Sequence, residues 1–132
     1  MELYNIIEGF TVMGVQVKTF PIGIKEAFES LMQTLGSRDY YGISWMDEND
    51  KIIYYAMAKE LFPGESRQYK FQKLRIEKGS YQTEILHNWQ NQTDCIKDLF
   101  QKLMGDKKPD NNHPCIEWYY SKDDMACMIK AD

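Results

Sequence analysis

Residues that hold metal ions or form disulfide networks are scarce in this sequence. Its 132 residues include three cysteines and two histidines, and no two cysteines have the C-x-x-C spacing. An odd number of scattered cysteines argues against a disulfide framework and against a zinc knuckle. We therefore expect no metal site and no cofactor, and this cysteine usage is typical of a protein from the reducing cytoplasm.

The sequence also lacks long hydrophobic segments and concentrated positive charge. No apolar run approaches the length that crosses a bilayer, and the first residues lack the pattern of a signal peptide. The formal net charge is -4 at pH 7, and no cluster of Lys and Arg is dense enough for wholesale nucleic-acid binding. We expect a cytoplasmic protein with no membrane segment and no direct contact with nucleic acid.

Aromatic residues and methionines are abundant instead. The chain has nine tyrosines, three tryptophans, six phenylalanines and eight methionines. Tyr and Trp combine a large apolar surface with a polar group, and Met adapts its shape, so this mixture suits apolar pockets that accept varied ligands. The same residues would equally fill the core of a small sheet protein, and composition alone leaves both interpretations open.

Apolar periodicity predicts the order of the elements. Residues 24–35 and 94–104 have helical spacing, and each segment is followed by a glycine. Thr93 is the expected N-cap of the second helix. Gly14, inside a predicted strand, indicates a bulge or a close approach of two backbones. Strands are expected over residues 8–20, 41–46, 52–58, 69–77, 80–86, 115–120 and 126–131.

The two halves of the chain share a pattern. The triplet I-S-W of residues 43–45 matches I-E-W of residues 116–118, and F-x-x-L-M-x-x-L of residues 28–35 matches I-x-x-L-F-x-x-L of residues 96–103. Both matches occur in the same order and at nearly the same separation. We therefore predict a tandem repeat of one strand-helix-strand-strand unit.

The repeat leads to a prediction for the whole fold. We expect one domain over residues 1–132, with repeat one at about 8–60 and repeat two at about 69–131. The fold class is α+β: an antiparallel sheet, two helices packed on one side, and a pseudo-twofold axis relating the halves. Pockets form readily at such junctions, so a central ligand groove is expected at the seam.

A carboxylate, Glu117, lies among apolar residues in the predicted strand over 115–120. Strand alternation places Ile116 and Trp118 on one face and Glu117 and Tyr119 on the other. A carboxylate that is buried without a partner either takes a raised pKa or requires a cation or a proton donor. Glu117 and Tyr119 are therefore site candidates, unless this face of the sheet points to solvent.

Two segments of the second half resemble the gyrase-inhibitor-like effector-binding domain, the ligand-sensing module of many bacterial transcription activators. Leu74-x-Ile-x-Lys-Gly-x-Tyr81 is similar to the family's strand, glycine turn and tyrosine. Pro114-Cys-Ile-Glu117-Trp-Tyr119 is similar to its "P-x-hydrophobic-E-x-Y" strand. The resemblance extends over about residues 10–130. It implies the two-repeat α+β fold and a central groove, lined by Glu117 and Tyr119, for lipophilic and often cationic molecules.

The resemblance further implies a domain for small-molecule binding, linked to transcription regulation or to sequestration of drugs or toxins (multidrug binding), and we expect it to be a stand-alone domain. No helix-turn-helix is expected, so a protein partner, such as a regulator or a gyrase-like target, would carry a regulatory effect. Where the family commonly has a glycine before the second helix, this chain has Asn88-Trp89. A Trp at that position could narrow the groove, so the type of ligand is not carried over.

Other large side chains are candidates for the groove walls, and each would otherwise be ordinary core or surface. These candidates are Tyr81, Trp45, Tyr55, Met57 and Trp89. An enzyme is the alternative function, because a groove glutamate beside a tyrosine could act as a general acid or orient water in a hydrolase of reactive electrophilic natural products. The sequence supplies no nucleophile paired with a base. A binding module is therefore favoured, and no catalytic residue is predicted.

Overall fold

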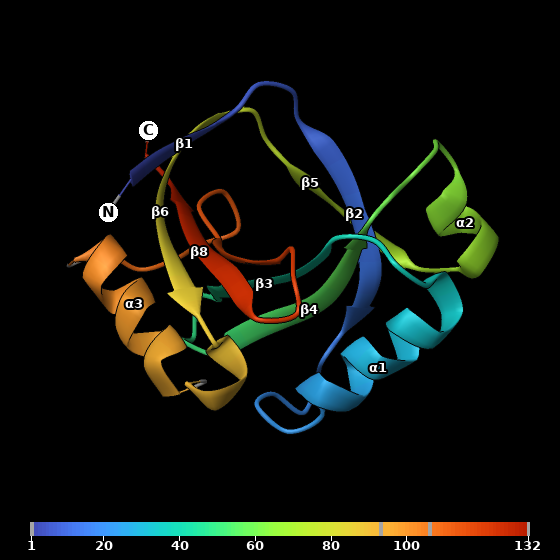
Figure 1. Cartoon of the computed structure of the whole chain (residues 1–132), viewed down its shortest axis with the longest axis horizontal. Coiled ribbons are helices and arrows are strands. Elements are labelled where there is room, and N and C mark those ends of the chain that lie inside the picture. The colour runs from blue at the N-terminus through green and yellow to red at the C-terminus, as the bar shows by residue number, and fades with distance from the viewer. Residues whose placement is uncertain (1, 93, 106, 132) are drawn as a thin grey trace.

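One curled antiparallel sheet organises the molecule (Figure 1). The computed structural model describes residues 2–92, 94–105 and 107–131. The described elements, in chain order, are β1 (Glu2–Ile6), β2 (Phe10–Gln16), α1 (Ile24–Leu35), β3 (Tyr40–Met46), β4 (Ile52–Lys59), α2 (Glu65–Tyr69), β5 (Gln72–Ile76), β6 (Gly79–His87), the 3-10 turn η1 (Trp89–Asn91), α3 (Asp94–Met104), β7 (Cys115–Tyr119) and β8 (Asp124–Lys130). The strand order is β1-β6-β8-β7-β3-β4-β2-β5. The sheet forms a half-barrel, and α1 and α3 lie against its outer face (Figure 1).

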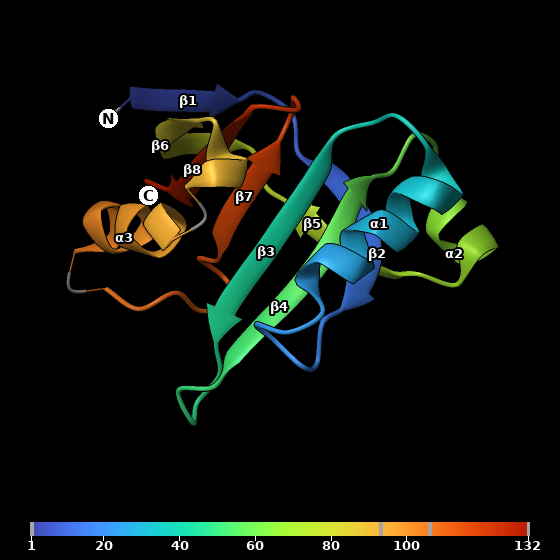
Figure 2. The same cartoon turned by 60° about the horizontal axis from the view of Figure 1, so that its bottom comes forward.

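The two halves of the chain repeat one arrangement, as the sequence predicts. The order β2-α1-β3-β4 recurs as β6-α3-β7-β8, and β3 lies beside β7 at the centre of the sheet (Figure 2). Ile43 pairs with Ile116 in the register of these two strands. The sequence match superimposes the same two residues, so the pseudo-twofold axis passes between them. The predicted α+β fold with two helices on one side is confirmed.

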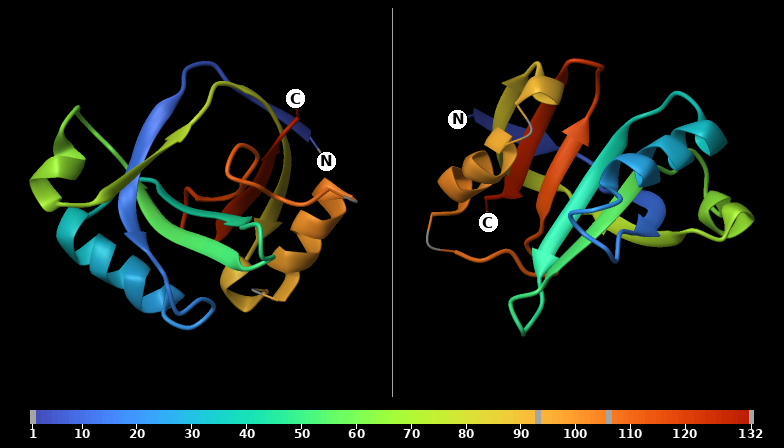
Figure 3. Two further views of the ribbon diagram at one scale, coloured as in Figure 1. Left: turned by 180° about the vertical axis from the view of Figure 1, so that it is seen from behind. Right: turned by 90° about the horizontal axis from the view of Figure 1, so that it is seen from below.

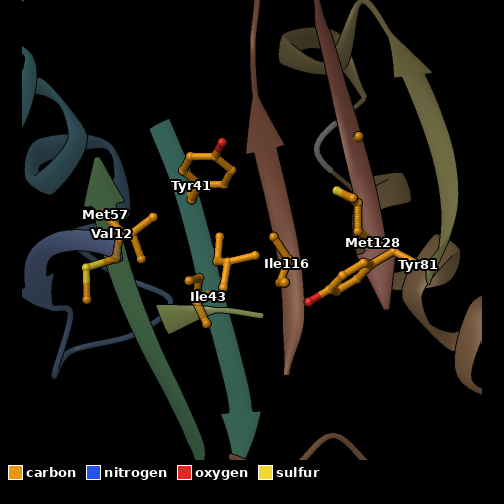
Figure 4. Packing of buried hydrophobic residues seen from close by; sticks show 9 residues of the cluster. Val12, Tyr41, Ile43, Met57, Tyr81, Ile116 and Met128 are labelled. Atoms are coloured by element: carbon orange, nitrogen blue, oxygen red, sulfur yellow. The ribbon is translucent and has the colours of Figure 1, made fainter. Parts of the chain in front are cut away.

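The two faces of the sheet carry different cores. The inner face encloses residues from both halves, among them Tyr41, Ile43, Ile116, Tyr81 and Met128 (Figure 4). On the outer face, α1 packs over β4 and α3 packs over β6 and β8. The alternation predicted for β7 is therefore confirmed, because its even-numbered residues face the inner core and Glu117 faces the helices.

Close packing of two strands explains a glycine in β2. A β-carbon built on Gly14 would overlap the carbonyl oxygen of Ala56 in the neighbouring strand β4. The predicted close backbone approach at Gly14 is therefore confirmed. Only a residue without a side chain allows β2 and β4 to pair at this distance.

Some element boundaries differ from the predictions. Strand β1 was not predicted, because its five residues lie at a sheet edge and its side chains are largely exposed, which leaves no clear alternation. The strand predicted over 69–77 begins at Gln72, and α2 precedes it. Helix α2 lies between Gly64 and Lys70, both with left-handed backbone, and is too short to show helical periodicity. The predicted N-cap Thr93 lies outside the described residues. None of the described helices has the length and apolar character needed to cross a membrane.

Candidate functional site

The helices α1 and α3 stand apart on the outer face, with β3 and β7 between them (Figure 2; Figure 3, right). An open groove of about 1700 Å³ lies between the two helices. Its floor includes Ser44, Tyr54, Cys115, Glu117 and Tyr119. Its walls are mainly apolar and include Phe28 and Met32 of α1, Trp89 of η1, and Ile96, Phe100 and Met104 of α3. The two repeats thus contribute one wall each to a shared groove.

Glu117 lies on the floor of this groove and is 9% exposed. Its Oε1 accepts hydrogen bonds from the hydroxyl groups of Tyr54 and Tyr119, each at 2.7 Å. Burial raises the pKa of Glu117 above its ordinary value, and the two phenol hydrogen bonds oppose part of that rise. Burial, together with the nearby carboxyl group, raises the pKa of both tyrosines well above 10.0, so they remain protonated donors at neutral pH.

The absence of a side chain at Gly42 makes room for this cluster. Gly42 pairs with Glu117 across β3 and β7, and with Ala56 across β3 and β4. A β-carbon on Gly42 would overlap both the Tyr54 hydroxyl and Glu117 Oε1. The three hydrogen-bonded side chains Tyr54, Glu117 and Tyr119 therefore meet above a glycine, and any larger residue would separate them.

The carboxyl group of Glu117 has donors but no cationic partner. Among residues 2–92, 94–105 and 107–131, no Lys, Arg or His forms an ion pair with it. Both of its hydrogen bonds reach Oε1, which leaves Oε2 able to accept another. A buried carboxylate in this condition is stabilised by any cation or donor that enters the groove.

Aromatic rings hold the two phenols in place. Phe20 stacks on Tyr54, with ring centroids 5.1 Å apart. Trp89 and Phe28 contact Tyr119 edge to face, at 4.9 Å and 5.5 Å. Trp89 forms part of the groove wall, and its Nε1 is buried without a hydrogen-bond acceptor in the described chain. Rings from both sides of the groove therefore pack against Tyr54 and Tyr119, the two residues that donate hydrogen bonds to Glu117.

Arg38 also borders the groove, but its charge is already compensated. Its Nη1 donates to Glu65 Oε1 at 2.9 Å and to the Lys59 carbonyl at 3.1 Å, and both charged side chains are buried. The same Glu65 oxygen accepts from the Leu61 amide. This network ties the end of β4 to α2 and leaves Arg38 engaged within the chain.

Cys115 brings a thiol to the groove floor. Burial, aided by the nearby Glu117, raises its pKa to about 12, so the sulfur is a neutral thiol at physiological pH. Among the described residues, no group of three His, Cys, Asp or Glu side chains is arranged to hold a metal ion.

The structure divides the residues singled out from the sequence between the two faces of the sheet. Glu117, Tyr119 and Trp89 line the groove, whereas Tyr81 and Met57 belong to the inner core. Trp45 borders the end of the groove, but its ring stacks on Tyr55, at 5.5 Å, against that same inner core. The structure thus does not bring Tyr81, Tyr55 or Met57 to the groove. Residues that alternate with Ser44 and Tyr54 along β3 and β4 necessarily point to the other face.

Sequence reasoning missed Tyr54, Gly42 and the helix residue Phe28. Tyr54 precedes Tyr55 in a strand where every residue is bulky or apolar, so its face could not be assigned without a register. Gly42 offered a usable signal, because a glycine within a strand often marks a close approach by another group.

Comparisons with known proteins show what the fold resembles. No protein-family model and no curated protein matches the sequence. An integron cassette protein from the mobile metagenome of Vibrio cholerae has a similar structure, with a TM-score of 0.66 and 16% identity over 98% of this chain and 94% of that one. At such a low sequence identity, the structural similarity to this protein establishes the fold alone.

Two further solved structures have the same fold. The structure of SAV2435 bound to tetraphenylphosphonium gives a TM-score of 0.59 and 11% identity, and covers 98% of this chain and 93% of that one. A protein of Staphylococcus aureus MU50, described as a bacterial transcription regulation protein, gives 0.58 and 10%, and covers 98% of this chain and 97% of that one.

Proposed function

We propose that this chain is a small-molecule-binding domain of the gyrase-inhibitor-like effector-binding type. Its groove binds lipophilic compounds that carry a positive charge or a proton donor. The observation that carries this proposal is Glu117, a buried carboxyl group with a raised pKa and no cationic partner among the described residues, on the floor of an apolar groove. A ligand cation would supply the missing charge.

The groove walls suit the apolar part of such a ligand. Phe28, Trp89 and Phe100 present aromatic surface from both sides. A cation near an aromatic face gains about 0.5–2 kcal/mol per contact, in addition to the apolar area that it buries. Tetraphenylphosphonium, the compound in the SAV2435 structure, combines aromatic rings with a positive charge and is a rational first probe.

The two phenols have a defined role in this proposal. Tyr54 and Tyr119 donate to one carboxyl oxygen and thereby fix the orientation of Glu117. Their hydrogen bonds also offset part of the burial that disfavours the charged carboxylate. The two phenols therefore lower the free energy needed to ionise Glu117, so that the carboxylate can form when a cation binds.

The cellular role that we propose follows the same class: a cytoplasmic domain that senses or sequesters its ligand. The shared fold with the Staphylococcus aureus protein that is described as a transcription regulation protein supports a link to gene regulation, which a protein partner would mediate. The hydrolase alternative receives less support. Cys115 is a neutral thiol, and the groove glutamate is bonded to two phenols rather than to a nucleophile and its base.

Titration with tetraphenylphosphonium tests the proposal. We expect a saturable change in tryptophan fluorescence, because Trp89 lies in the groove wall. Glu117→Gln should weaken binding by about 1–3 kcal/mol, which is the scale of the loss when a charged contact becomes neutral. Glu48→Gln, in the exposed turn between β3 and β4, is the matched control and should bind as the wild type does. An unchanged affinity in the Glu117 variant, with its fold intact by circular dichroism, would exclude Glu117 from the site.

A further inference from the structure

Strand β5 forms an open edge of the sheet. It pairs with β2 on one side and is the last strand in the order. An edge strand presents unpaired backbone N–H and C=O groups that can pair with another strand. Leu74 and Ile76 pack into the inner core, so Lys73 and Arg75 point to the outer face. The edge therefore combines free backbone groups with two exposed cations.

Helix α2 and the residue that follows it add two more cations beside this edge. Arg67, Lys70 and Lys73 line a hollow of about 390 Å³, together with Gly64, Ser66 and Phe71. We call Arg67, Lys70, Lys73 and Arg75 the basic patch. None of the four forms an ion pair with any residue in the described ranges. Residues 66–76 contain these four cations and no Asp or Glu, in a chain whose net charge is -4.

Prevention of aggregation at the β5 edge does not explain all four cations of the basic patch. Charged side chains on an edge strand commonly prevent edge-to-edge aggregation, which would explain Lys73 and Arg75. The cations on and after α2 lie outside the strand, yet they share the hollow with Lys73. The loop that leads into α2 also exposes Leu61 and Phe62, which are 62% and 50% exposed.

We infer that the β5 edge and the basic patch form a docking surface for an extended, acidic segment of a partner protein. The segment would add to the sheet beside β5, and its carboxylates would contact the basic patch. Backbone pairing of this kind provides affinity, while alternate side chains provide specificity. This inference concerns a surface separate from the groove and stands without the proposed ligand.

Charge and backbone geometry distinguish this occupant from others. A nucleic acid has no strand backbone to pair with β5, and the net negative charge of the chain opposes its approach. A second copy that paired β5 with β5 would place Lys73 and Arg75 against the same cations, and like charges opposite each other destabilise a strand pair. An acidic polypeptide strand would pair with the peptide groups at the β5 edge and with the four cations of the basic patch, which have no ion-pair partner in the described part of the chain.

A peptide of alternating glutamate and valine, labelled with fluorescein, is the probe. We expect saturable binding by fluorescence anisotropy at low salt and slower amide exchange in β5. Two control peptides should bind about tenfold more weakly or worse: one with a central proline, which breaks backbone pairing, and one with lysine in place of glutamate. Unlabelled oligothymidylate should not displace the peptide.

Charge reversal maps the binding to the surface. Lys73→Glu with Arg75→Glu should weaken peptide binding by about tenfold or more, because like charges are then juxtaposed. Arg67→Glu with Lys70→Glu tests the other side of the hollow and serves if the first variant does not fold. Lys51→Glu, on the exposed β3–β4 turn, is the matched control and should leave binding unchanged.

Four results would each overturn the inference. They are an absence of saturable binding, equal binding of the proline peptide, affinity unchanged in both folded charge-reversal variants, and displacement by oligothymidylate. Sedimentation velocity tests whether a second copy of this chain occupies the surface instead. Self-association of the wild type, accompanied by slower amide exchange in β5, would assign this edge to a second copy instead.

Discussion

Glu117 differs from other acidic residues of the chain in the direction of its pKa shift. Hydrogen bonds from Arg38 and from Lys102 lower the pKa of Glu65 and Glu84, whereas burial raises that of Glu117. A carboxyl group with a raised pKa and an incomplete set of partners is unfavourable for stability, and such groups concentrate at functional sites. At the scale of the residue, these properties agree with the ligand-binding role that we propose for Glu117.

The raised pKa predicts a specific pH dependence of stability. Because the folded protein holds the Glu117 proton more tightly than the unfolded chain, whose pKa is near 4.5, its contribution is complete below that pH and is lost as pH rises through the folded value. The free energy of unfolding of the wild type, minus that of Glu117→Gln, should therefore fall with rising pH above 4.5.

Urea unfolding of both proteins between about pH 4 and about pH 8 measures this difference, and the subtraction removes the other titrating groups. Cation affinity should rise over the same range as Glu117 ionises. A difference that stays flat, or that grows with pH, would mean that Glu117 ionises at its ordinary pKa or below.

At the scale of elements, the junction of β3 and β7 positions the carboxyl group of Glu117 on the floor of the groove. Tyr54 comes from β4, and Glu117 and Tyr119 come from β7, so the cluster spans β3 without using a β3 side chain. Gly42 is the position of β3 that lies beneath them. The hydrogen bonds across this seam depend on the spacing of three strands and on one missing side chain.

Gly42→Ala tests this arrangement. The added methyl group would overlap both the Tyr54 hydroxyl and Glu117 Oε1, so we expect a loss of about 1–3 kcal/mol in the free energy of unfolding, as in other overpacked cores. Tetraphenylphosphonium affinity should fall as well, because the carboxyl group is displaced. Ser44→Ala, on the same face of β3, is the control and should change stability by less than about 0.5 kcal/mol. A Gly42 variant with wild-type stability and affinity would show that the cluster of Tyr54, Glu117 and Tyr119 can accommodate an added methyl group.

At the scale of the whole molecule, the repeat places one helix of each half on either side of the groove (Figure 3, right). A ligand between α1 and α3 contacts both halves of the chain, although a continuous sheet already joins them. Binding should therefore stabilise the molecule as one unit rather than one repeat alone.

Hydrogen exchange with and without tetraphenylphosphonium measures this coupling. At a free ligand concentration of 100 times Kd, we expect a stabilisation of about 2.7 kcal/mol and slower exchange in both α1 and α3. Helix α2 does not line the groove and provides the internal control for local protection. Protection confined to α1 or to α3 would place the ligand on one repeat and contradict a shared site.

Amphipathic periodicity and strand alternation determined much of this protein from sequence alone. The two long helices have the predicted bounds, because each has one apolar face and ends at a glycine, Gly36 or Gly105. The opposite facing of Ile116 and Glu117 in β7 also follows from alternation, which is a local property of any strand. The repeat of the two halves was visible in the same patterns.

Tertiary structure alone decided which residues surround Glu117. Tyr54 meets it and Tyr81 does not, because partners across strands depend on the register of β3 with β4 and β7. A short turn joins β3 to β4, but β7 is far from β3 in the sequence, so no turn fixes the pairing of β3 with β7. The role of Gly42 and the grouping of the four basic-patch cations likewise arise only when separate segments pack together. Local chemistry thus determined the apolar faces of the two long helices and the two faces of β7, and the long-range pairing of strands determined which of those faces came together.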